Sequence, residues 1–456
     1  MDDGGPNGER GAGRRRPTRL GVVVVAIAII VVVATAIGGG LPGLFGPGGL
    51  EISGVEVARA GVARASADPA DAVSAGAAID AFGVDLYHRL AGSKGNVVFS
   101  PTSIVFSLAM ARPGAKGATA AGMDVVMHNA AADANAGWLD ALDAILATRN
   151  GTFKDASDRD ADVALRLADG AFAQKGMAIV PAYLDALARR FGIGLQLVDY
   201  ATDPRAAERA IDAWVSARTD GRIPTLIAPG SFDASTRLML VNAIYLKAAW
   251  AIPFNPDMTS LTPFTDAHGN RQDVPTMTMG DAVDLGYASG AGWQAVELPY
   301  AGGALAMTIV LPDDLATFER TMTAESLASI GTSVSSKVPV YLWLPRFTIQ
   351  MQTDLSADLG ALGMADALNV ADFSGIAPNE GLVISGVVHH ADITVGEKGT
   401  EASAATSTVL QAVGRRVGSV DVRVDHPFLF LVRDVPTGAI LFMGRVQKPA
   451  ASSAIP

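Results

Sequence analysis

Residues 397–413 read Glu397-Lys-Gly-Thr-Glu-Ala-Ser-Ala-Ala-Thr-Ser-Thr-Val-Leu-Gln-Ala-Val413. Alternate side chains of a β-strand point to opposite faces, and here one face carries no charge, which predicts a half-buried strand. The side chains are small and bury little area, so little holds such a strand in place on its own. We therefore expect a strand that fits tightly into a sheet but need not start there. Its uncharged face consists of Thr400, Ala402, Ala404, Thr406, Thr408 and Leu410.

Composition limits the classes of protein that remain possible. The chain has 456 residues, of which 49% are hydrophobic and 18% charged, enough for one large globular domain or a few smaller ones. A net charge of -11 argues against a nucleic-acid binder, because neutralising phosphates needs a basic surface. The absence of cysteine excludes disulfides, thiolate metal sites and cysteine nucleophiles. Proteins or small molecules are the expected partners.

Residues 1–37 are predicted to be a targeting segment rather than part of the fold. Five arginines precede the uncharged run Leu20–Ile37, whose eighteen residues are at the lower edge of what spans a bilayer. The basic side stays in the cytoplasm, so the rest of the chain is expected outside the cell. Ala34-Thr-Ala36 has the spacing of a signal-peptidase site, so cleavage and permanent anchoring both stay open.

The rest of the chain is interpreted as one domain over residues 73–449, after a Gly/Pro/Ala-rich linker (38–72) and before a tail (450–456). Helical spacing or helix-start signals favour helices over 77–91, 104–110, 139–147, 181–191 and 206–217. β-like runs follow at 238–246, 293–298, 304–311, 338–344, 382–395 and 427–432. Helices first and strands later indicate an α+β fold.

Motifs for catalysis are missing from the sequence. It has no Gly-x-Ser-x-Gly, His-Glu-x-x-His or Gly-x-x-x-x-Gly-Lys pattern. His389, His390 and Asp392 suggest metal ligands, but neighbours on a strand point to opposite faces, so a metal site is not expected. His389 shares its face with Ala391, which favours a buried, hydrogen-bonded histidine. A hydrolase using Ser100 with His389 is disfavoured, because Ser100 stands at a helix start among apolar residues.

Several blocks in order resemble the serpin family, the serine protease inhibitors that act by loop insertion. Each block is a weak signal alone, but together they span about Val73 to Pro449 and are highly specific. They include Asn96-Val-Val-Phe-Ser-Pro-Thr-Ser-Ile104, Val241-Asn-Ala-Ile-Tyr-Leu-Lys247, Glu297-Leu-Pro-Tyr300, Leu344-Pro-Arg-Phe347, Gly399-Thr-Glu401, Asp425-His-Pro-Phe-Leu-Phe430 and Phe442-Met-Gly444.

The resemblance implies a three-sheet α+β domain with about eight to nine helices and an exposed reactive-centre loop. It implies an irreversible suicide-substrate inhibitor of serine proteases, not an enzyme, with no cofactor. The target cleaves the loop and forms an acyl-enzyme, and the loop then inserts into the central sheet as a new strand. The inhibitor contributes no catalytic group, because the target supplies the chemistry.

Three groups of residues match the family's functional positions. The hinge segment, which must enter the sheet, is Glu397, Lys398, Gly399, Thr400, Glu401, Ala402, Ser403, Ala404, Ala405 and Thr406. The breach cluster, where the loop first enters, is Trp250, Arg346 and Glu397, with an Arg346–Glu397 ion pair expected to hold the sheet closed. The shutter cluster, beneath the centre of the sheet, is Ser100, Ser103, Asn242 and His389. A charged or bulky inward-facing hinge residue would hinder insertion, and this segment has none.

The scissile bond follows from the family's commonest loop length. Seventeen residues from Glu397 lead to Val413, which makes Val413–Gly414 the reactive bond and favours an elastase- or subtilisin-like target. A longer loop would present Arg415 or Arg416 to a trypsin-like enzyme instead. A non-inhibitory serpin acting as a surface-binding protein is the alternative function. The predicted inhibitor is an exported monomer, extracellular or anchored to the membrane by its N-terminal segment.

Overall fold

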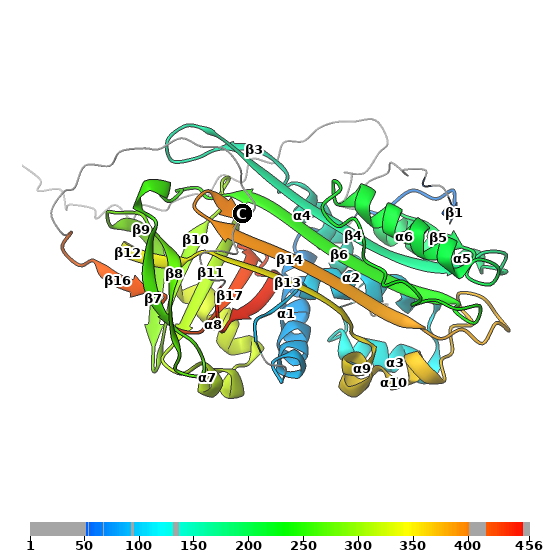
Figure 1. Ribbon diagram of the computed structural model, residues 1–456. Helices are drawn as coiled ribbons and strands as arrows, with labels where there is room; N and C mark the ends of the chain where they lie inside the picture. The colour runs from blue at the N-terminus through cyan, green and yellow to red at the C-terminus, as the bar shows by residue number, and fades with distance from the viewer. Residues whose placement is uncertain are drawn as a thin grey trace, which may run out of the picture. The chain divides into compact units, whose positions relative to one another are not determined.

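The computed structural model describes residues 52, 54–66, 68–92, 95–130, 136–400 and 416–449 (Figure 1). The predicted targeting segment, the C-terminal tail, hinge residues 401–406 and the reactive-bond residues 413–415 lie outside this part of the chain. Within the described residues, no helix is both long and apolar enough to cross a membrane.

The predicted functional residues lie mainly on and around an eight-stranded sheet, here called sheet A. Its strand order is β1-β5-β4-β6-β15-β14-β13, and β3 pairs with β4. Strands β4 and β6 are antiparallel, and β6 and β14 are parallel. The two-residue strand β15 lies between β6 and β14 and is antiparallel to both. The strands are β1 (Glu56–Ala58), β3 (Gly151–Lys154), β4 (Asp160–Gln174), β5 (Leu195–Val198), β6 (Leu238–Ala249), β13 (Phe347–Asp354), β14 (Gly386–Gly396) and β15 (Gly399–Thr400).

A second sheet of ten strands has the order β2-β18-β17-β11-β10-β9-β12-β8-β7, with β16 paired to β12. The third sheet expected from the resemblance corresponds to β7, β8, β12 and β16, which the β9–β12 pairing joins to the second. The ten strands of this second sheet are β2 (Val97–Phe99), β7 (Ser260–Thr265), β8 (Arg271–Thr278), β9 (Val283–Gly290), β10 (Trp293–Pro299), β11 (Leu305–Pro312), β12 (Lys337–Pro345), β16 (Val420–Arg423), β17 (Phe428–Asp434) and β18 (Ile440–Val446).

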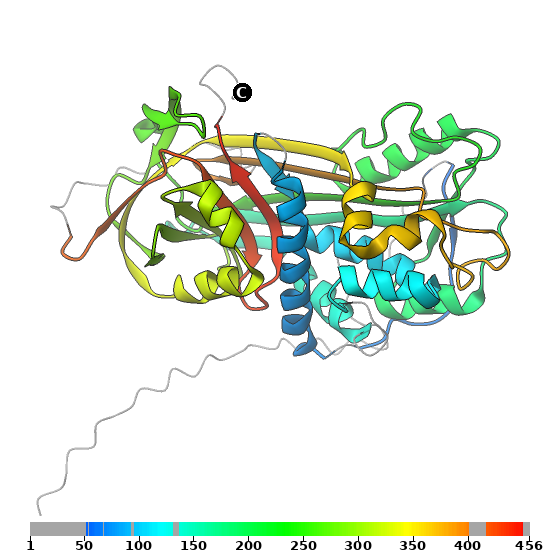
Figure 2. The same ribbon diagram turned by 90° about the horizontal axis from the view of Figure 1, so that it is seen from below.

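Helices cover both faces of sheet A. Helix α6 packs Ile211 and Trp214 against one face, in a core shared with Val241 of β6. Helix α2 lies against the other face and also contacts β18 of the second sheet, while α1 runs beside it (Figure 2). The helices are α1 (Asp71–Leu90), α2 (Pro101–Ala111), α3 (Gly117–Val126), α4 (Ala136–Ala147), α5 (Pro181–Phe191), α6 (Pro204–Arg218), α7 (Leu315–Thr321), α8 (Ala324–Ser333), α9 (Ser356–Leu359) and α10 (Ala365–Asn369).

The predicted α+β class is confirmed, and most predicted elements are present with ends shifted by a few residues. The helix predicted over 181–191 has those bounds. The sequence pattern missed β4, a long strand in the half of the chain expected to be helical. Its run contains Asp169 and Gly170 among apolar residues, which breaks both the strand and the helix patterns.

The linker predicted for residues 38–72 needs a correction, because part of it belongs to the folded body. Strand β1 pairs with β5 and forms the edge of sheet A. Further along, Arg64 forms ion pairs with Asp140 and Asp143 of α4, both of them buried. A three-residue strand carries too little pattern to be recognised, and its partner is far away in sequence.

Candidate functional site

The hinge segment has already begun to enter sheet A. Strands β6 and β14 pair directly from Met239–Gly386 to Ile244–Ala391, and their direct pairing ends there. Four residues further along both strands, β15 lies between them: Thr400 pairs with Val395 of β14 on one side and with Ala248 of β6 on the other. Sheet A is therefore closed where residues 239–244 and 386–391 pair, which is here called its lower half. Beyond them, in its upper half, the first hinge residues separate β6 from β14.

Glycine at position 399 is required by the close fit of β15. Gly399 has φ +143°, a conformation that side chains with a Cβ rarely adopt. A Cβ there would lie 2.1 Å from the carbonyl oxygen of Ala248, far inside contact distance. The chain can therefore turn from Gly396 into the sheet at this point only with glycine.

The breach residues hold the start of the hinge. Glu397 Oε1 accepts hydrogen bonds from Arg346 Nε at 2.6 Å and from Thr259 Oγ1 at 2.6 Å, and Arg346 Nη2 also contacts it. The Glu397 side chain is only 9% exposed, so this pair lies in a less screened environment than an ordinary surface pair. The structure thus brings together Arg346 and Glu397 as the sequence comparison implied.

Trp250 joins the breach to the inserted residues. Its indole Nε1 donates to the carbonyl oxygen of Gly396 at 2.9 Å, and its backbone N–H donates to Lys398 at 2.8 Å. The ring stacks on Tyr300 with centroids 4.5 Å apart. The Tyr300 hydroxyl lies 2.7 Å from Thr400 Oγ1, so the first inward hinge side chain has a buried hydrogen-bond partner. Tyr300 was not among the predicted site residues.

The shutter residues form a continuous buried hydrogen-bond chain. Ser100 is the N-cap of α2, where its hydroxyl accepts from the backbone N–H of Ser103 at 3.1 Å. The backbone N–H of Ser100 donates to His389 Nε2 at 3.1 Å, and His389 Nδ1 contacts Asn242 Oδ1. All four side chains belong to residues with 0% exposure. The four predicted residues are therefore in contact beneath the lower, closed half of sheet A.

These contacts fix the state of the His389 ring. Because Nε2 accepts from an N–H, it carries no proton, and Nδ1–H must donate to Asn242. If Nε2 were protonated, its N–H would face the backbone N–H of Ser100, and neither donor would have an acceptor. Burial, aided by the neighbouring His390, lowers the pKa of His389 to about 3. The ring is therefore neutral at physiological pH and acts as both acceptor and donor.

Asp169 extends the shutter cluster and was not predicted. It is 3% exposed, and its Oδ1 accepts from the Ser103 hydroxyl at 2.6 Å. In the sheet register Asp169 pairs with Asn242, which pairs in turn with His389. Three polar residues thus form a row across β4, β6 and β14. The only signal in the sequence was one acidic residue within an otherwise apolar stretch.

Arg416, the first described residue after the reactive loop, contacts the body of the protein. Arg416 forms an ion pair with Asp284 at 3.1 Å and donates to the carbonyl oxygen of Ala282 at 3.2 Å. Its own carbonyl accepts from Ser419 N at 3.2 Å, in a turn that leads into β16. Arg416, an alternative reactive-bond residue, is therefore engaged with the body of the protein.

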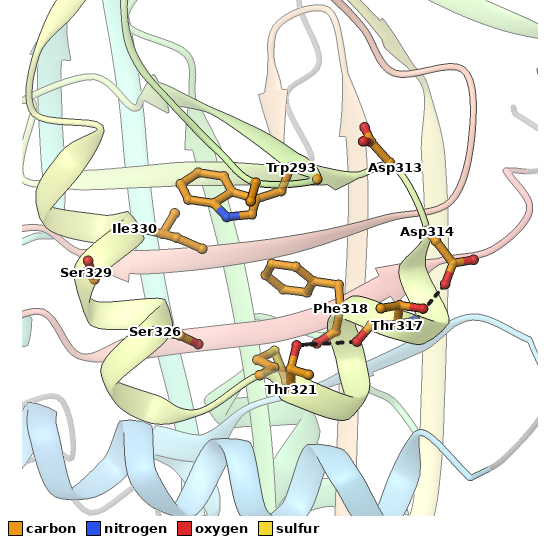
Figure 3. Close-up of a pocket in the computed structure, with 12 residues that line it drawn as sticks. Trp293, Asp313, Asp314, Thr317, Phe318, Thr321, Ser326, Ser329 and Ile330 are labelled. Atoms are coloured by element: carbon orange, nitrogen blue, oxygen red, sulfur yellow. Dashed lines mark hydrogen bonds between the residues drawn. The ribbon is translucent and has the colours of Figure 1, made fainter.

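A surface pocket of about 480 Å³ lies away from these clusters, between the β9–β10 turn and helices α7 and α8 (Figure 3). Trp293, Phe318 and Ile330 supply apolar walls, and Asp313 and Asp314 lie at one side. Asp314 caps α7 by accepting from Thr317 N. None of the hinge, breach or shutter residues lines this pocket.

The arrangement does not support hydrolysis by Ser100 and His389. The Ser100 hydroxyl is buried and bonded to a helix N-terminus, and His389 faces the Ser100 backbone rather than its hydroxyl. Among the described residues, no group of three His, Asp or Glu side chains is placed to hold a metal ion. The geometry is instead that of sheet A, in which the shutter cluster links β6 to β14 and the first hinge residues lie between the same two strands.

Comparison with known proteins identifies the family. The family model "Serpin (serine protease inhibitor)" matches residues 77–449. The chain belongs to the serpin family. Leukocyte elastase inhibitor A of Rattus norvegicus is 34% identical over 385 residues, covering 82% of this chain and 99% of that protein. A serpin-like protein of Thermococcus kodakarensis is 35% identical over 377 residues, covering 82% of this chain and 85% of that protein.

Solved serpin structures have the same fold. Uncleaved ovalbumin matches with a TM-score of 0.71 and 28% identity, over 82% of this chain and all of that one (100%). The thermophilic serpin tengpin in its native state matches with a TM-score of 0.73 over 86% of this chain and 97% of that one; at 24% identity this likeness concerns the fold alone. This serpin belongs to a family of protease inhibitors and is not an enzyme.

Replacing Gly399 should expel β15 from the sheet. In Gly399→Ala the left-handed backbone costs about 1–2 kcal/mol and the new methyl group meets Ala248. We expect faster hydrogen–deuterium exchange over residues 396–400 and at Trp250. Gly396→Ala is the control, because a Cβ at Gly396 has nothing within 4 Å. Unchanged exchange in Gly399→Ala would contradict the tight fit.

The buried neutral histidine should make this serpin acid-sensitive. His389 has its pKa lowered from 6.5 to about 3, so the unfolded chain binds the proton first as pH falls. Its stabilisation is fully present above pH 6.5 and is lost by up to about 1.4 kcal/mol per pH unit below it. His389→Gln keeps one acceptor and one donor without this titration. Urea unfolding from pH 7 to 4 should show a shallower loss in the variant, and parallel curves would contradict the assignment.

Proposed function

We propose that this serpin is an irreversible suicide-substrate inhibitor of extracellular serine proteases. The target cleaves the reactive loop, remains attached as an acyl-enzyme, and is trapped when the loop inserts into sheet A. The observation that carries the proposal is β15, which places Gly399 and Thr400 between β6 and β14, so that a continuing strand would follow the line along which those two strands pair.

The register of β15 supports continued insertion. Extending it places Ala402 opposite Leu246 and Ile393, and Ala404 opposite Ile244 and Ala391. Both are small, uncharged and on the same face as Thr400, so they add no desolvation penalty.

The same register brings Thr406 between Asn242 and His389. Insertion at this point must separate those two side chains and break their hydrogen bond. A threonine hydroxyl can accept from His389 Nδ1–H and donate to Asn242 Oδ1, so it can satisfy both groups after they part. The hinge sequence thereby supplies a replacement for the one shutter bond that insertion breaks.

The chemistry of trapping belongs to the target protease. Its serine hydroxyl attacks the carbonyl carbon of the residue before the reactive bond, and its histidine takes the hydroxyl proton. The peptide bond then breaks, and the departing amine receives that proton, leaving an ester between loop and protease. This serpin has to complete insertion before water hydrolyses the ester.

Val413–Gly414 is the favoured reactive bond. Arg416 is held by Asp284 and begins a turn that includes Gly418 with φ +77°. A protease binds the residues around a scissile bond in extended form, as peptides bind to sheet edges. A bond at Arg415–Arg416 would place this turn in the protease cleft, whereas Val413–Gly414 leaves residues free before it.

Two further observations bear on the target. Val413 suits a protease with an apolar specificity pocket of modest size, and the relatives named leukocyte elastase inhibitors agree with an elastase-like enzyme. A subtilisin-like enzyme has the same requirement, and a trypsin-like target would need Arg415 or Arg416 instead. The competing function is a non-inhibitory serpin; the absence of proline and charge from the inward hinge positions favours inhibition.

Export outside the cell is part of the proposal. The arginine-rich start and the uncharged run Leu20–Ile37 support a signal or anchor segment, as expected of an exported serpin of the bacterial type. The inhibitor is proposed to act as a monomer, without a cofactor, on one protease molecule at a time. The N-terminal segment is its contact with the membrane.

Mixing the protein with elastase, subtilisin and trypsin tests the function. An SDS-resistant covalent complex is expected with elastase or subtilisin, and the cleaved protein should melt at a higher temperature because the inserted strand adds two hydrogen-bonded edges. Cleavage by all three without a complex and without a change in melting temperature would refute inhibition.

A pair of hinge variants tests the insertion mechanism. Ala402→Arg places a charge on the inward face, so insertion should slow and the protein should become a substrate that is cleaved and released. Glu401→Arg changes a charge on the outward face and should still form the complex. Equal complex formation by both variants would mean that the inward face is not buried during trapping.

The mass of the released C-terminal fragment locates the reactive bond. We expect a fragment that begins at Gly414 and ends at Pro456. A fragment that begins at Arg416 or Val417 would instead assign the bond to the arginine pair and point to a trypsin-like target. Denaturing mass spectrometry of the reaction with each protease distinguishes these masses.

A further inference from the structure

The row Asp169–Asn242–His389 contains two buried atoms without a hydrogen-bond partner. They are Asp169 Oδ2 and the amide nitrogen of Asn242. The two residues are directly paired neighbours on β4 and β6, so their side chains lie on the same face. A free amide donor beside a free carboxyl oxygen is an unused hydrogen bond in the closed sheet.

Asn242 is committed to His389 while the sheet is closed. Its Oδ1 accepts from His389 Nδ1–H across the β6–β14 pairing, and that pairing must open for a loop strand to enter. Once released from His389, the Asn242 amide can turn towards Asp169. An ionised carboxylate accepts this N–H, whereas a protonated Oδ2–H would oppose it with a second donor.

We propose that Asp169 is a positioning residue for loop insertion, which in its ionised form captures the Asn242 amide as the shutter opens. The inference rests on the proposed insertion of the loop, but not on which protease is trapped. Asp169 thereby becomes a member of the shutter cluster on β4. Its role is to hold β6 in place after β14 has separated from β6.

The proton on Asp169 would then control insertion. Burial raises the pKa of Asp169 well above 3.8, and the negative charge of Asp143 on α4 raises it further. The Ser103 hydroxyl, which bonds Oδ1, and the nearby Ala243 backbone N–H act in the opposite direction, but neither forms a hydrogen bond with Oδ2. The closed sheet therefore favours the protonated acid, and the opened sheet favours the ionised form. Opening releases a proton, so it should become easier as pH rises.

The other titratable groups near the row are accounted for. On α4, Asp140 and Asp143 are paired with Arg64, and burial raises the pKa of Asp140 despite that pairing. On β14, His389 has a pKa of about 3, and burial lowers the pKa of His390 from 6.5. Neither histidine changes charge appreciably above pH 6.5. A rate that rises between pH 6.5 and 9 is thus assigned to a buried carboxyl.

Annealing of a loop peptide to the full-length protein tests the inference without any protease. A labelled synthetic peptide with the sequence of residues 402–412, blocked at both ends, contains no titratable side chain. Its incorporation into the sheet is followed by native gel electrophoresis from pH 6.5 to 9. In the wild type the rate should rise with pH, by at most about tenfold per pH unit for a single proton. In Asp169→Asn the rate should be independent of pH.

Asp80→Asn is the matched control. Asp80 is another buried carboxyl, whose pKa is raised to about 7 mainly by burial, but it bonds to the backbone of Ile440 and not to the shutter. This variant should keep the wild-type annealing profile. A flat wild-type profile, an Asp169→Asn profile equal to the wild type, or no annealing at any pH would each overturn the inference. Annealing that follows the expected pattern in a protein that traps no protease would retain the inference and reject the proposed function.

Discussion

The direct pairing of β6 with β14 is the constraint on which the functional geometry depends. It joins two strands separated by more than a hundred residues of chain and ends at Ile244 and Ala391, and β15 pairs with both strands from Ala248 and Val395 onward. Below that point the sheet is sealed by a parallel ladder and by the shutter bonds. Above it, Glu397 and Trp250 hold the first hinge residues in position. In this structure the first hinge residues therefore lie between β6 and β14, while the rest of the β6–β14 pairing is intact.

Hydrogen bonding explains why such a state can store free energy. A strand inserted between β6 and β14 replaces one parallel ladder by two antiparallel ones, and antiparallel pairing is slightly the more stable per residue. Each added hydrogen bond contributes a net of about 0.5–1.5 kcal/mol, so a strand of ordinary length outweighs the bonds that opening breaks. In the proposed insertion the barrier lies in the lower half, because the His389–Asn242 contact would have to break before Thr406 could replace it. Stability and function consequently oppose each other at the shutter.

The sequence pattern predicted much of this arrangement where local chemistry determines it. Ser100 was expected at a helix start, and it is the observed cap of α2. The alternation around His389 placed that residue on a buried face, as observed. Long-range pairing could not be predicted in this way. Strand β1 is too short to carry a pattern, and the row formed by Asp169 depends on the register of three strands. The Arg346–Glu397 contact came from the family resemblance, since nothing local links residues 51 positions apart.

Electrostatics links the N-terminal part of the folded body to the shutter. Arg64 lies 2.7 Å from Asp143, and the charge of Asp143 acts on Asp169, which in turn bonds to Ser103 beneath the sheet. Without a cation, two buried carboxylates on α4 would both resist ionisation. With Arg64 in place, Asp140 and Asp143 share a cation, whereas no cation among the described residues is paired with Asp169. The segment that appeared in the sequence as a linker thus helps decide which acid beside the sheet carries the proton.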